Sequence, residues 1–248
     1  MVEALKLPKG LVGPLGILLF SVGLLLGMTL LGATVWADFE AVLFDPGIQQ
    51  DASLRSLRCP VLITPSETGT VRARLFNPLE RPTQRYVSAH ITDGYVVLMR
   101  EEDKSVSLEP GQRQDLTWTV TADDAAFERL ILVNVVLRGR YPLPSRKGTC
   151  GILVVGVPFM TGKQILGLTL GASLLMMAAG LGLWFRAERF LYRRRHRLIR
   201  AMGALAAAVL VGLIVALAGW WLPGLIIFFV ILLGIGVIIG HFLNGVGG

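Results

Sequence analysis

Two kinds of hydrophobic pattern follow each other along this chain. Four stretches, residues 14–36, 164–185, 201–221 and 222–243, contain no charged side chain. At 1.5 Å per residue, about 20 helical residues span a hydrocarbon core of roughly 30 Å. The pattern therefore predicts four transmembrane helices, which we place at residues 14–36, 163–185, 201–221 and 222–243.

The long segment between the first two helices changes to a period of two. Residues 71–76, 86–91 and 115–120 alternate apolar and polar side chains, as half-buried strands do, and residues 129–137 predict a more buried strand. Turn-forming Pro, Gly, Asn and Asp residues separate these strands. About seven or eight short strands in roughly 100 residues predict an antiparallel β-sandwich within residues 37–162.

One motif in this segment resembles a known family. Residues 68–78 form a strand that ends in Asn-Pro, and residues 106–112 contain a Leu-x-Pro-Gly turn before another alternating strand. This pattern resembles bacterial immunoglobulin-like domains, which recur in adhesive or spacer modules at cell surfaces. The resemblance implies a fold and not a function. The predicted fold class is a four-helix transmembrane bundle with an inserted all-β, extracytoplasmic immunoglobulin-like sandwich.

Charge bias sets the expected orientation. Residues 38–163 hold equal numbers of basic and acidic residues, so the net charge of +7 lies beside the apolar segments. Short basic loops stay in the cytoplasm. We therefore predict that residues 1–13, 186–200 and 244–248 are cytoplasmic and that residues 37–162 are extracytoplasmic. This distribution also argues against a nucleic-acid partner.

The connection at residues 186–200 is the most basic part of the chain. We interpret it as a topology anchor, and binding of anionic lipid headgroups is a second possibility for the same residues. Its seven arginines are Arg186, Arg189, Arg193, Arg194, Arg195, Arg197 and Arg200.

The first apolar stretch has a second interpretation. It is also compatible with a cleaved signal peptide that ends at Val35-Trp36-Ala37. Its apolar run of about 20 residues exceeds the usual hydrophobic region of 7–15 residues. We therefore expect an uncleaved anchor in a multi-pass protein of the plasma or inner membrane.

The two cysteines, Cys59 and Cys150, both lie in the segment predicted to be extracytoplasmic. Disulfides form and persist on that side of the membrane, so we predict that they pair near the first and last strands. Two free buried thiols are the alternative. Two cysteines and three scattered histidines lack the spacing of metal ligands, so we expect no metal.

Small residues recur at every fourth position in the predicted helices. This spacing lets helix backbones approach closely in lipid. We predict that these residues pack helices together, within the chain or against other membrane protein subunits. They are Gly23, Gly27, Gly167, Gly171, Ala204, Ala208, Gly212, Ala216, Gly236 and Gly240.

No catalytic chemistry stands out. Residues 156–163 resemble a phosphate-binding loop, but Gln164 replaces the Ser or Thr that would hold magnesium, so we expect no nucleotide. His241 could ligate a pigment or haem, but a lone His at a helix end more often lies at the membrane interface. We predict no catalytic residue and no cofactor.

The uncharged helix cores also argue against ion-coupled transport, which usually places ionisable residues inside the membrane. We therefore predict a non-enzymatic accessory or scaffold subunit of a cell-envelope membrane complex. It would dock partners through the external sandwich and the close-packing helices. The alternatives are a channel or carrier for a lipid or apolar solute, and a surface receptor or adhesin.

Overall fold

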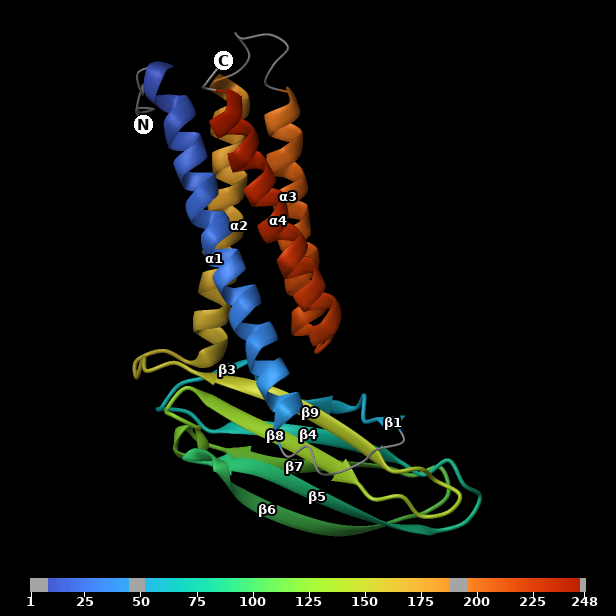
Figure 1. Ribbon diagram of the computed structural model, residues 1–248. Helices are drawn as coiled ribbons and strands as arrows, with labels where there is room; N and C mark the ends of the chain where they lie inside the picture. Colours follow the sequence, from blue (N-terminus) through green and yellow to red (C-terminus); the bar gives the residue numbers. More distant parts are fainter. Residues whose placement is uncertain (1–8, 45–51, 188–195, 246–248) are drawn as a thin grey trace, which may run out of the picture. The chain divides into compact units, whose positions relative to one another are not determined.

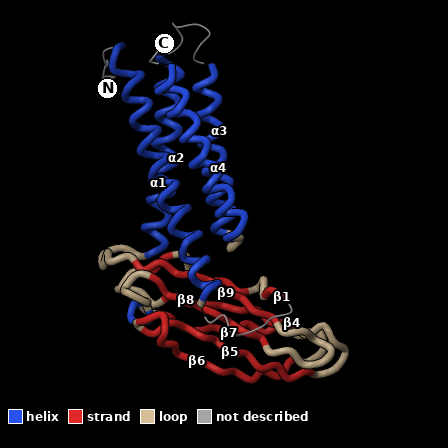
Figure 2. Tube along the Cα trace, viewed as in Figure 1, coloured by secondary structure: helices blue, strands red, loops and turns tan. Residues whose placement is uncertain are grey.

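The computed structural model describes residues 9–44, 52–187 and 196–245 and divides the chain into two compact units. We call Met1–Gly32 together with Gly167–Gly248 the helical unit, and Ala33–Leu166 the β-domain. Helices dominate the first unit and strands the second (Figures 1 and 2). Each unit is described by itself below.

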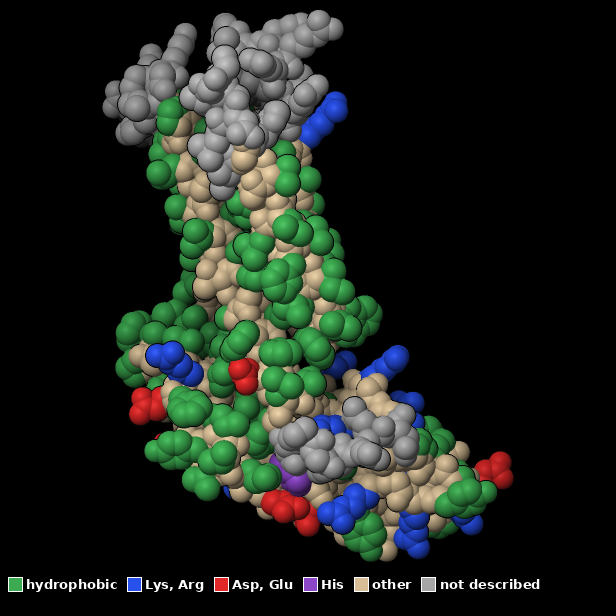
Figure 3. Space-filling view, viewed as in Figure 1, with side chains coloured by type: hydrophobic (Ala, Val, Ile, Leu, Met, Phe, Trp, Pro, Cys, Tyr) green, Lys and Arg blue, Asp and Glu red, His purple; other side chains and the backbone are tan. Residues whose placement is uncertain are grey.

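The four predicted helices are present, with different ends. They are α1 (Lys9–Leu43), α2 (Gly162–Ala187), α3 (His196–Leu217) and α4 (Trp221–Gly245). Three contain spans long and apolar enough to cross a membrane, Val12–Leu43, Gly162–Arg186 and Arg200–Leu217. Among its described residues α4 has a shorter apolar stretch, Trp221–Val237. On the face shown in Figure 3, the helical unit presents mostly hydrophobic side chains.

Two helix boundaries differ from the predicted ones. α1 continues through Asp38 to Leu43, beyond the predicted membrane span that ends at Trp36, and its last turns belong to the β-domain. α3 ends at Leu217, before the predicted end at residue 221, and Gly219 in the turn that follows has φ of +80°. Pro223 lies in the first turn of α4, where proline is tolerated because its missing N–H would have no helical partner.

Two sheets make up most of the β-domain. Sheet A has the order β1-β9-β8-β5-β6, with β3 also paired to β9, and sheet B has the order β2-β4-β7. The strands are β1 (Ala52–Ser53), β2 (Leu57–Arg58), β3 (Leu62–Ile63), β4 (Gly69–Phe76), β5 (Thr83–Asp93), β6 (Tyr95–Leu108), β7 (Arg113–Val120), β8 (Leu130–Leu137) and β9 (Arg146–Val154). β1 and β3 pair parallel with β9, so the expected fully antiparallel arrangement is wrong for sheet A.

One apolar core lies between the sheets. In β4 the alternating residues Val71, Ala73 and Leu75 are buried in it, and in β7 Trp118 is only 1% exposed. β5 and β8 contribute from sheet A, so residues of both sheets belong to the same cluster. The alternation therefore places one face of each sheet against this core and leaves the other face outside it.

The Asn and Leu-x-Pro-Gly residues of the immunoglobulin-like motif meet at one end of the β-domain. The buried side-chain amide of Asn77 donates to the carbonyl oxygens of Leu108 and Glu109 at 2.9 and 3.1 Å. The N–H of Gly111, which has φ of +70°, donates to the carbonyl oxygen of Asn77 at 3.0 Å. The motif thus joins the end of β4 to the β6–β7 turn.

The last turns of α1 lie on the outer face of sheet A. The N–H of Gly151 in β9 donates to Asp38 Oδ1 at 3.1 Å. A Cβ atom at Gly151 would overlap the backbone of Ala37, so only glycine permits this approach. Phe44, just after α1, packs against Leu132 of β8.

Candidate interaction surfaces

The predicted disulfide between Cys59 and Cys150 is present. Cys59 lies between β2 of sheet B and β3 of sheet A, and Cys150 lies in β9 beside Gly151. The bond therefore links the segment that passes from sheet B to sheet A to β9. β9 is also the strand that contacts the last turns of α1. It closes a sequence separation of 91 residues.

In the helical unit, α1 and α2 approach each other at small residues spaced seven apart. A Cβ atom at Gly16 would lie 3.0 Å from the carbonyl oxygen of Gly180, and one at Gly23 would lie 2.7 Å from that of Ser173. Residue numbers rise on α1 as they fall on α2, so the helices run antiparallel. The predicted spacing of four does not include Gly16, Ser173 or Gly180, although these residues make the contact.

A buried hydrogen bond lies at this close approach. Ser173 Oγ donates to the carbonyl oxygen of Gly23 at 2.7 Å. A Cβ atom at Gly27, one turn further along α1, would lie 2.8 Å from the same hydroxyl oxygen and from Val209 of α3. Glycine at positions 23 and 27 therefore lets a polar side chain pack between helix backbones.

The other small residues singled out by the spacing of four divide into two groups. Gly212 contacts Leu31 and Ile227, Ala216 is buried, Ala208 is half-buried and Ala204 is exposed. No neighbouring atom within the described chain lies within 4 Å of a Cβ built at Gly167, Gly171, Gly236 or Gly240. Packing at these four glycines stays a prediction that concerns a neighbouring molecule.

Much of the arginine-rich connection lies outside the described residues, namely Arg189, Arg193, Arg194 and Arg195. Arg186 is exposed near the end of α2, Arg197 lies in the first turn of α3, and Arg200 is exposed in that helix. Its proposed roles in topology and lipid binding stay predictions.

The segment that resembles a phosphate-binding loop leads into α2. The N–H of Gly162 donates to Glu67 Oε1 at 2.6 Å, and the same oxygen accepts from the N–H of Thr64 at 2.9 Å. A carboxylate of the chain itself therefore occupies this helix N-terminus and ties it to the β3–β4 turn. Of the candidate ligands, His90 lies on β5 with Nε2 3.3 Å from Glu101, and His241 lies in α4.

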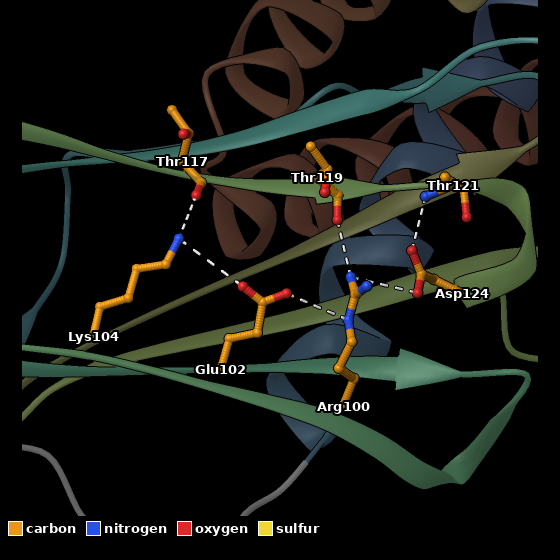
Figure 4. Close-up of polar contacts among 7 residues, drawn as sticks. All are labelled: Arg100, Glu102, Lys104, Thr117, Thr119, Thr121 and Asp124. Carbon is orange, nitrogen blue, oxygen red and sulfur yellow. Dashed lines mark hydrogen bonds and ion pairs between the residues drawn. The ribbon is translucent and has the colours of Figure 1, made fainter.

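A charged cluster closes the edge where β6 and β7 face each other (Figure 4). Arg100 Nη2 donates to the carbonyl oxygen of Thr119 at 2.9 Å, and Lys104 Nζ donates to that of Thr117 at 2.7 Å. Glu102 lies between the two cations, 3.6 Å from Arg100 Nε and 3.9 Å from Lys104 Nζ. Side chains from β6 thus occupy carbonyl groups on the free edge of β7.

The ends of this cluster are also anchored. Asp124 Oδ1 lies 3.5 Å from Arg100 Nη2, while Asp124 Oδ2 accepts from the N–H of Thr121 at 2.7 Å. Lys104 Nζ lies 5.0 Å from the centre of the Trp118 ring. Charged residues that point inward from an edge strand prevent pairing with foreign strands. The cluster therefore stabilises the sheet edge rather than forming a reactive site.

The opposite half of β6 is apolar and exposed. Tyr95, Val96, Val97, Leu98 and Met99 are all exposed or nearly so, and Val97 is 85% exposed. Phe127 is 67% exposed and packs edge-on against Tyr95 at a centroid distance of 6.2 Å. We call these six residues the apolar tip.

An unusual backbone holds Phe127 in place. Phe127 and Glu128 have φ of 53° and 58°, and the N–H of Phe127 donates to the carbonyl oxygen of Gly94 at 3.2 Å. Bulky residues rarely adopt positive φ, which costs about 1–3 kcal/mol per residue. Phe127 and Glu128 thus keep a strained backbone that leaves the Phe127 ring exposed to solvent. Strained backbone of this kind is often found at functional sites. The sequence signal for this surface was the run of five apolar residues at 95–99 next to Asp93-Gly94.

Comparison with known proteins adds a likeness of fold. No family model matches the chain, and no curated protein matches it. The CARDB domain of a Pyrococcus furiosus protein, solved in complex with di-metal ions, is 15% identical over 40% of this chain and 84% of that one, with a TM-score of 0.32. A Bacteroides uniformis β-glucuronidase is 16% identical over 38% of this chain but 12% of its own, with a TM-score of 0.30. Each of these likenesses covers about two fifths of the chain.

Proposed function

We propose that the chain is an integral membrane subunit that displays an immunoglobulin-like β-sandwich outside the cytoplasm and docks a partner protein there. It acts as a non-enzymatic accessory or scaffold subunit of a cell-envelope complex. The observation that carries the proposal is the apolar tip, because large exposed apolar patches on soluble domains mark protein interaction sites.

The rest of the β-domain supports this choice of surface. The C-terminal half of β6 is closed by charges that bind the β7 carbonyls. Residues 95–99 of the same strand carry no such protection. Charged side chains thus protect one half of this edge strand, whereas the other half is apolar and unprotected. Such a difference is expected where a partner covers the unprotected half.

The orientation rests on two features. The Cys59–Cys150 disulfide is typical of an oxidising compartment, and the arginine-rich connection is typical of a cytoplasmic loop. Both support an extracytoplasmic β-domain. An epitope inserted in the β6–β7 turn after Glu109 should bind antibody on intact cells, whereas one placed after Gly248 should bind only after permeabilisation. Labelling of the second epitope on intact cells would contradict this topology.

Photo-crosslinking tests the docking surface. A photo-reactive amino acid at Val97 should yield one discrete adduct with another protein in the native membrane. Ser107 is the matched control, because it is exposed on the same strand but lies beyond the charged cluster. An adduct at position 97 that is absent at 107 supports the subunit role. Absence of adducts at both positions, with full crosslinker incorporation, argues against it.

The helical unit offers a second contact of the same kind. Gly167 and Gly171 of α2 have no neighbour in the described chain, which leaves room for a helix of another subunit. Replacing both by Leu should release that subunit during purification in mild detergent while the β-domain stays folded. Retention of the partner by this variant would place its helix elsewhere.

A further inference from the structure

The outer face of sheet B carries arginines in register. Val71, Ala73 and Leu75 of β4 are buried in the core, so Arg72 and Arg74 point outward. Strand pairing puts Arg58 of β2 directly opposite Arg72, and Arg113 of β7 directly opposite Phe76. We call the four exposed arginines, Arg58, Arg72, Arg74 and Arg113, the arginine face.

Acidic side chains neutralise this face only in part. Arg74 forms a two-point pair with Asp115, at 2.7 and 3.0 Å. Within the described part of the chain, Arg58, Arg72 and Arg113 form no ion pair with a carboxylate. Like charges directly opposite each other destabilise a sheet. The placement of Arg58 opposite Arg72 therefore lowers the stability of the sheet. Such unfavourable contacts are expected at functional surfaces.

Among the described residues of the β-domain, the helical turns at the end of α1 do not cover this face. The last turns of α1 lie against Gly151 and Leu132 on the outer face of sheet A. The apolar core lies between that contact and sheet B. The arginine face therefore lies on the opposite side of the β-domain from α1 and is open to a ligand.

The size of the face limits what can bind. β4 and β7 have eight residues each, so the face is about 27 Å long and about 10 Å wide. Its area of about 300 Å² is well below the roughly 800 Å² that each partner contributes to a stable protein interface. A single extended chain fits these dimensions, whereas a folded protein does not.

The backbone chemistry disfavours a peptide as that chain. Peptides bind sheets mainly by adding a strand at an edge, and the side chains of Arg100 and Lys104 occupy carbonyl groups on the free edge of β7. A peptide laid across the face would find its backbone groups unpaired, because those of β4 already pair with β2 and β7.

We infer that the arginine face binds an acidic polysaccharide whose sugar carboxylates repeat along the chain. Guanidinium groups bind carboxylates in a two-point geometry, and the three arginines without a carboxylate partner lie along the face, Arg58 and Arg72 side by side and Arg113 further along β7, so a chain with repeated carboxylates can meet them in turn. Phe76 is 51% exposed and its ring lies under Arg113, with the guanidinium carbon 5.5 Å from the ring centre, so an apolar surface borders the charged groups that a sugar chain would meet. This binding role is independent of the apolar tip and takes from the proposed function only the extracytoplasmic side.

The test measures binding of the full-length chain, in nanodiscs of neutral lipid, to immobilised polygalacturonate. Arg58→Gln/Arg72→Gln should bind at least about tenfold more weakly, since each lost charged contact is a strong one. Arg138→Gln/Arg140→Gln removes two exposed arginines elsewhere on the β-domain and should bind within about twofold of wild type. Arg72→Lys keeps the positive charge but loses the two-point hydrogen-bonding geometry of the guanidinium group, and should weaken binding by roughly threefold.

Three outcomes decide the inference, and a fourth bears on the topology alone. Selective loss in the Arg58/Arg72 variant, with polyglutamate bound more weakly than polygalacturonate, supports it. Equal binding by all variants overturns it, and so does a preference for polyglutamate, which would assign the face to acidic protein. Binding in nanodiscs but not on intact cells would leave the arginine face intact and contradict the proposed topology instead.

Discussion

The helical unit and the β-domain are stabilised in opposite ways. In the helical unit the closest contact between α1 and α2 is made by the smallest residues, Gly16, Gly23 and Gly180, with one buried hydroxyl. In the β-domain the core is made by large side chains such as Trp118, and a disulfide joins the segment between β2 and β3 to the last strand, β9. Packing thus depends on small residues in the helical unit and on large apolar side chains in the β-domain.

The solvent expected around each unit explains the difference. In water, burying a large apolar side chain contributes about 1.5–3 kcal/mol. In lipid that gain vanishes, because the tails are as apolar as the side chains, and close backbone contact with hydrogen bonding takes over. Under the proposed membrane location, a core-forming side chain helps the β-domain, whereas even one methyl group harms the α1–α2 contact.

Loss of the disulfide should be the largest effect, and it should be confined to the β-domain. For a separation of 91 residues, Cys59→Ala/Cys150→Ala is expected to cost roughly 4–5 kcal/mol in the chain-entropy model. Hydrogen exchange of the full-length protein in mild detergent measures this, because the β8 amides should exchange much faster. The amides of α1 near Gly23 serve as the control. Unchanged protection in β8 would contradict the prediction.

Adding a methyl group at the α1–α2 contact tests the helical unit in the same way. A Cβ atom at Gly23 would lie within 2.8 Å of backbone atoms of both Ser173 and Met177, so Gly23→Ala must push the helices apart. We expect a loss of about 1–3 kcal/mol, as for other overpacked sites. Titration with a denaturing detergent measures it.

Gly171→Ala is the matched control for this substitution, in the purified chain separated from the partner subunit proposed above. It makes the same change on α2, where no neighbour within the described chain lies within 4 Å. It should be neutral or stabilising by up to about 1 kcal/mol, because alanine favours helix more than glycine does. Equal destabilisation by Gly171→Ala in the chain without its partner would contradict the open space beside Gly171.

The sequence predicts the number of helices well because a run of about 20 uncharged, mostly apolar residues is seldom found outside membrane helices. It predicts strands β4 and β7 for a similar reason, since Val71 and Trp118 sit in clean alternation. The sequence pattern does not predict β6, because its inward positions carry Arg100, Glu102 and Lys104 and so break the alternation of apolar and polar residues. Their partners are carbonyl groups on β7, and only the folded structure brings these together.

The packing residues show the same limit. A spacing of four selected Gly167 and Gly171, which face away from the described chain, and missed Ser173 and Gly180, which make the contact. Antiparallel helices repeat their contacts about every seven residues. The sequence does not state which repeat applies, because it predicts opposite directions for α1 and α2 but not which face of each helix meets the other.

Ser173→Ala separates the hydrogen bond from close packing. The substitution removes the donor to the Gly23 carbonyl oxygen but leaves the backbones free to approach. Such bonds between membrane helices contribute about 0.6 kcal/mol on average and at most about 1.7 kcal/mol. We expect a loss in that range, measured by the same detergent titration. Ser21→Ala, on an exposed position of α1, should change nothing.

The smallest effect should come from the exposed pair between Arg74 and Asp115, where water screens the charges. The Arg74 guanidinium lowers the pKa of Asp115 below its ordinary value of 3.8, so the pair stabilises the fold above that pH and loses this effect as pH falls through the lowered pKa. The melting temperatures of wild type and Arg74→Gln should therefore differ slightly at neutral pH and converge in acid. High salt should reduce the difference further. A gap that widened in acid would show that Arg74 acts through something other than this carboxylate.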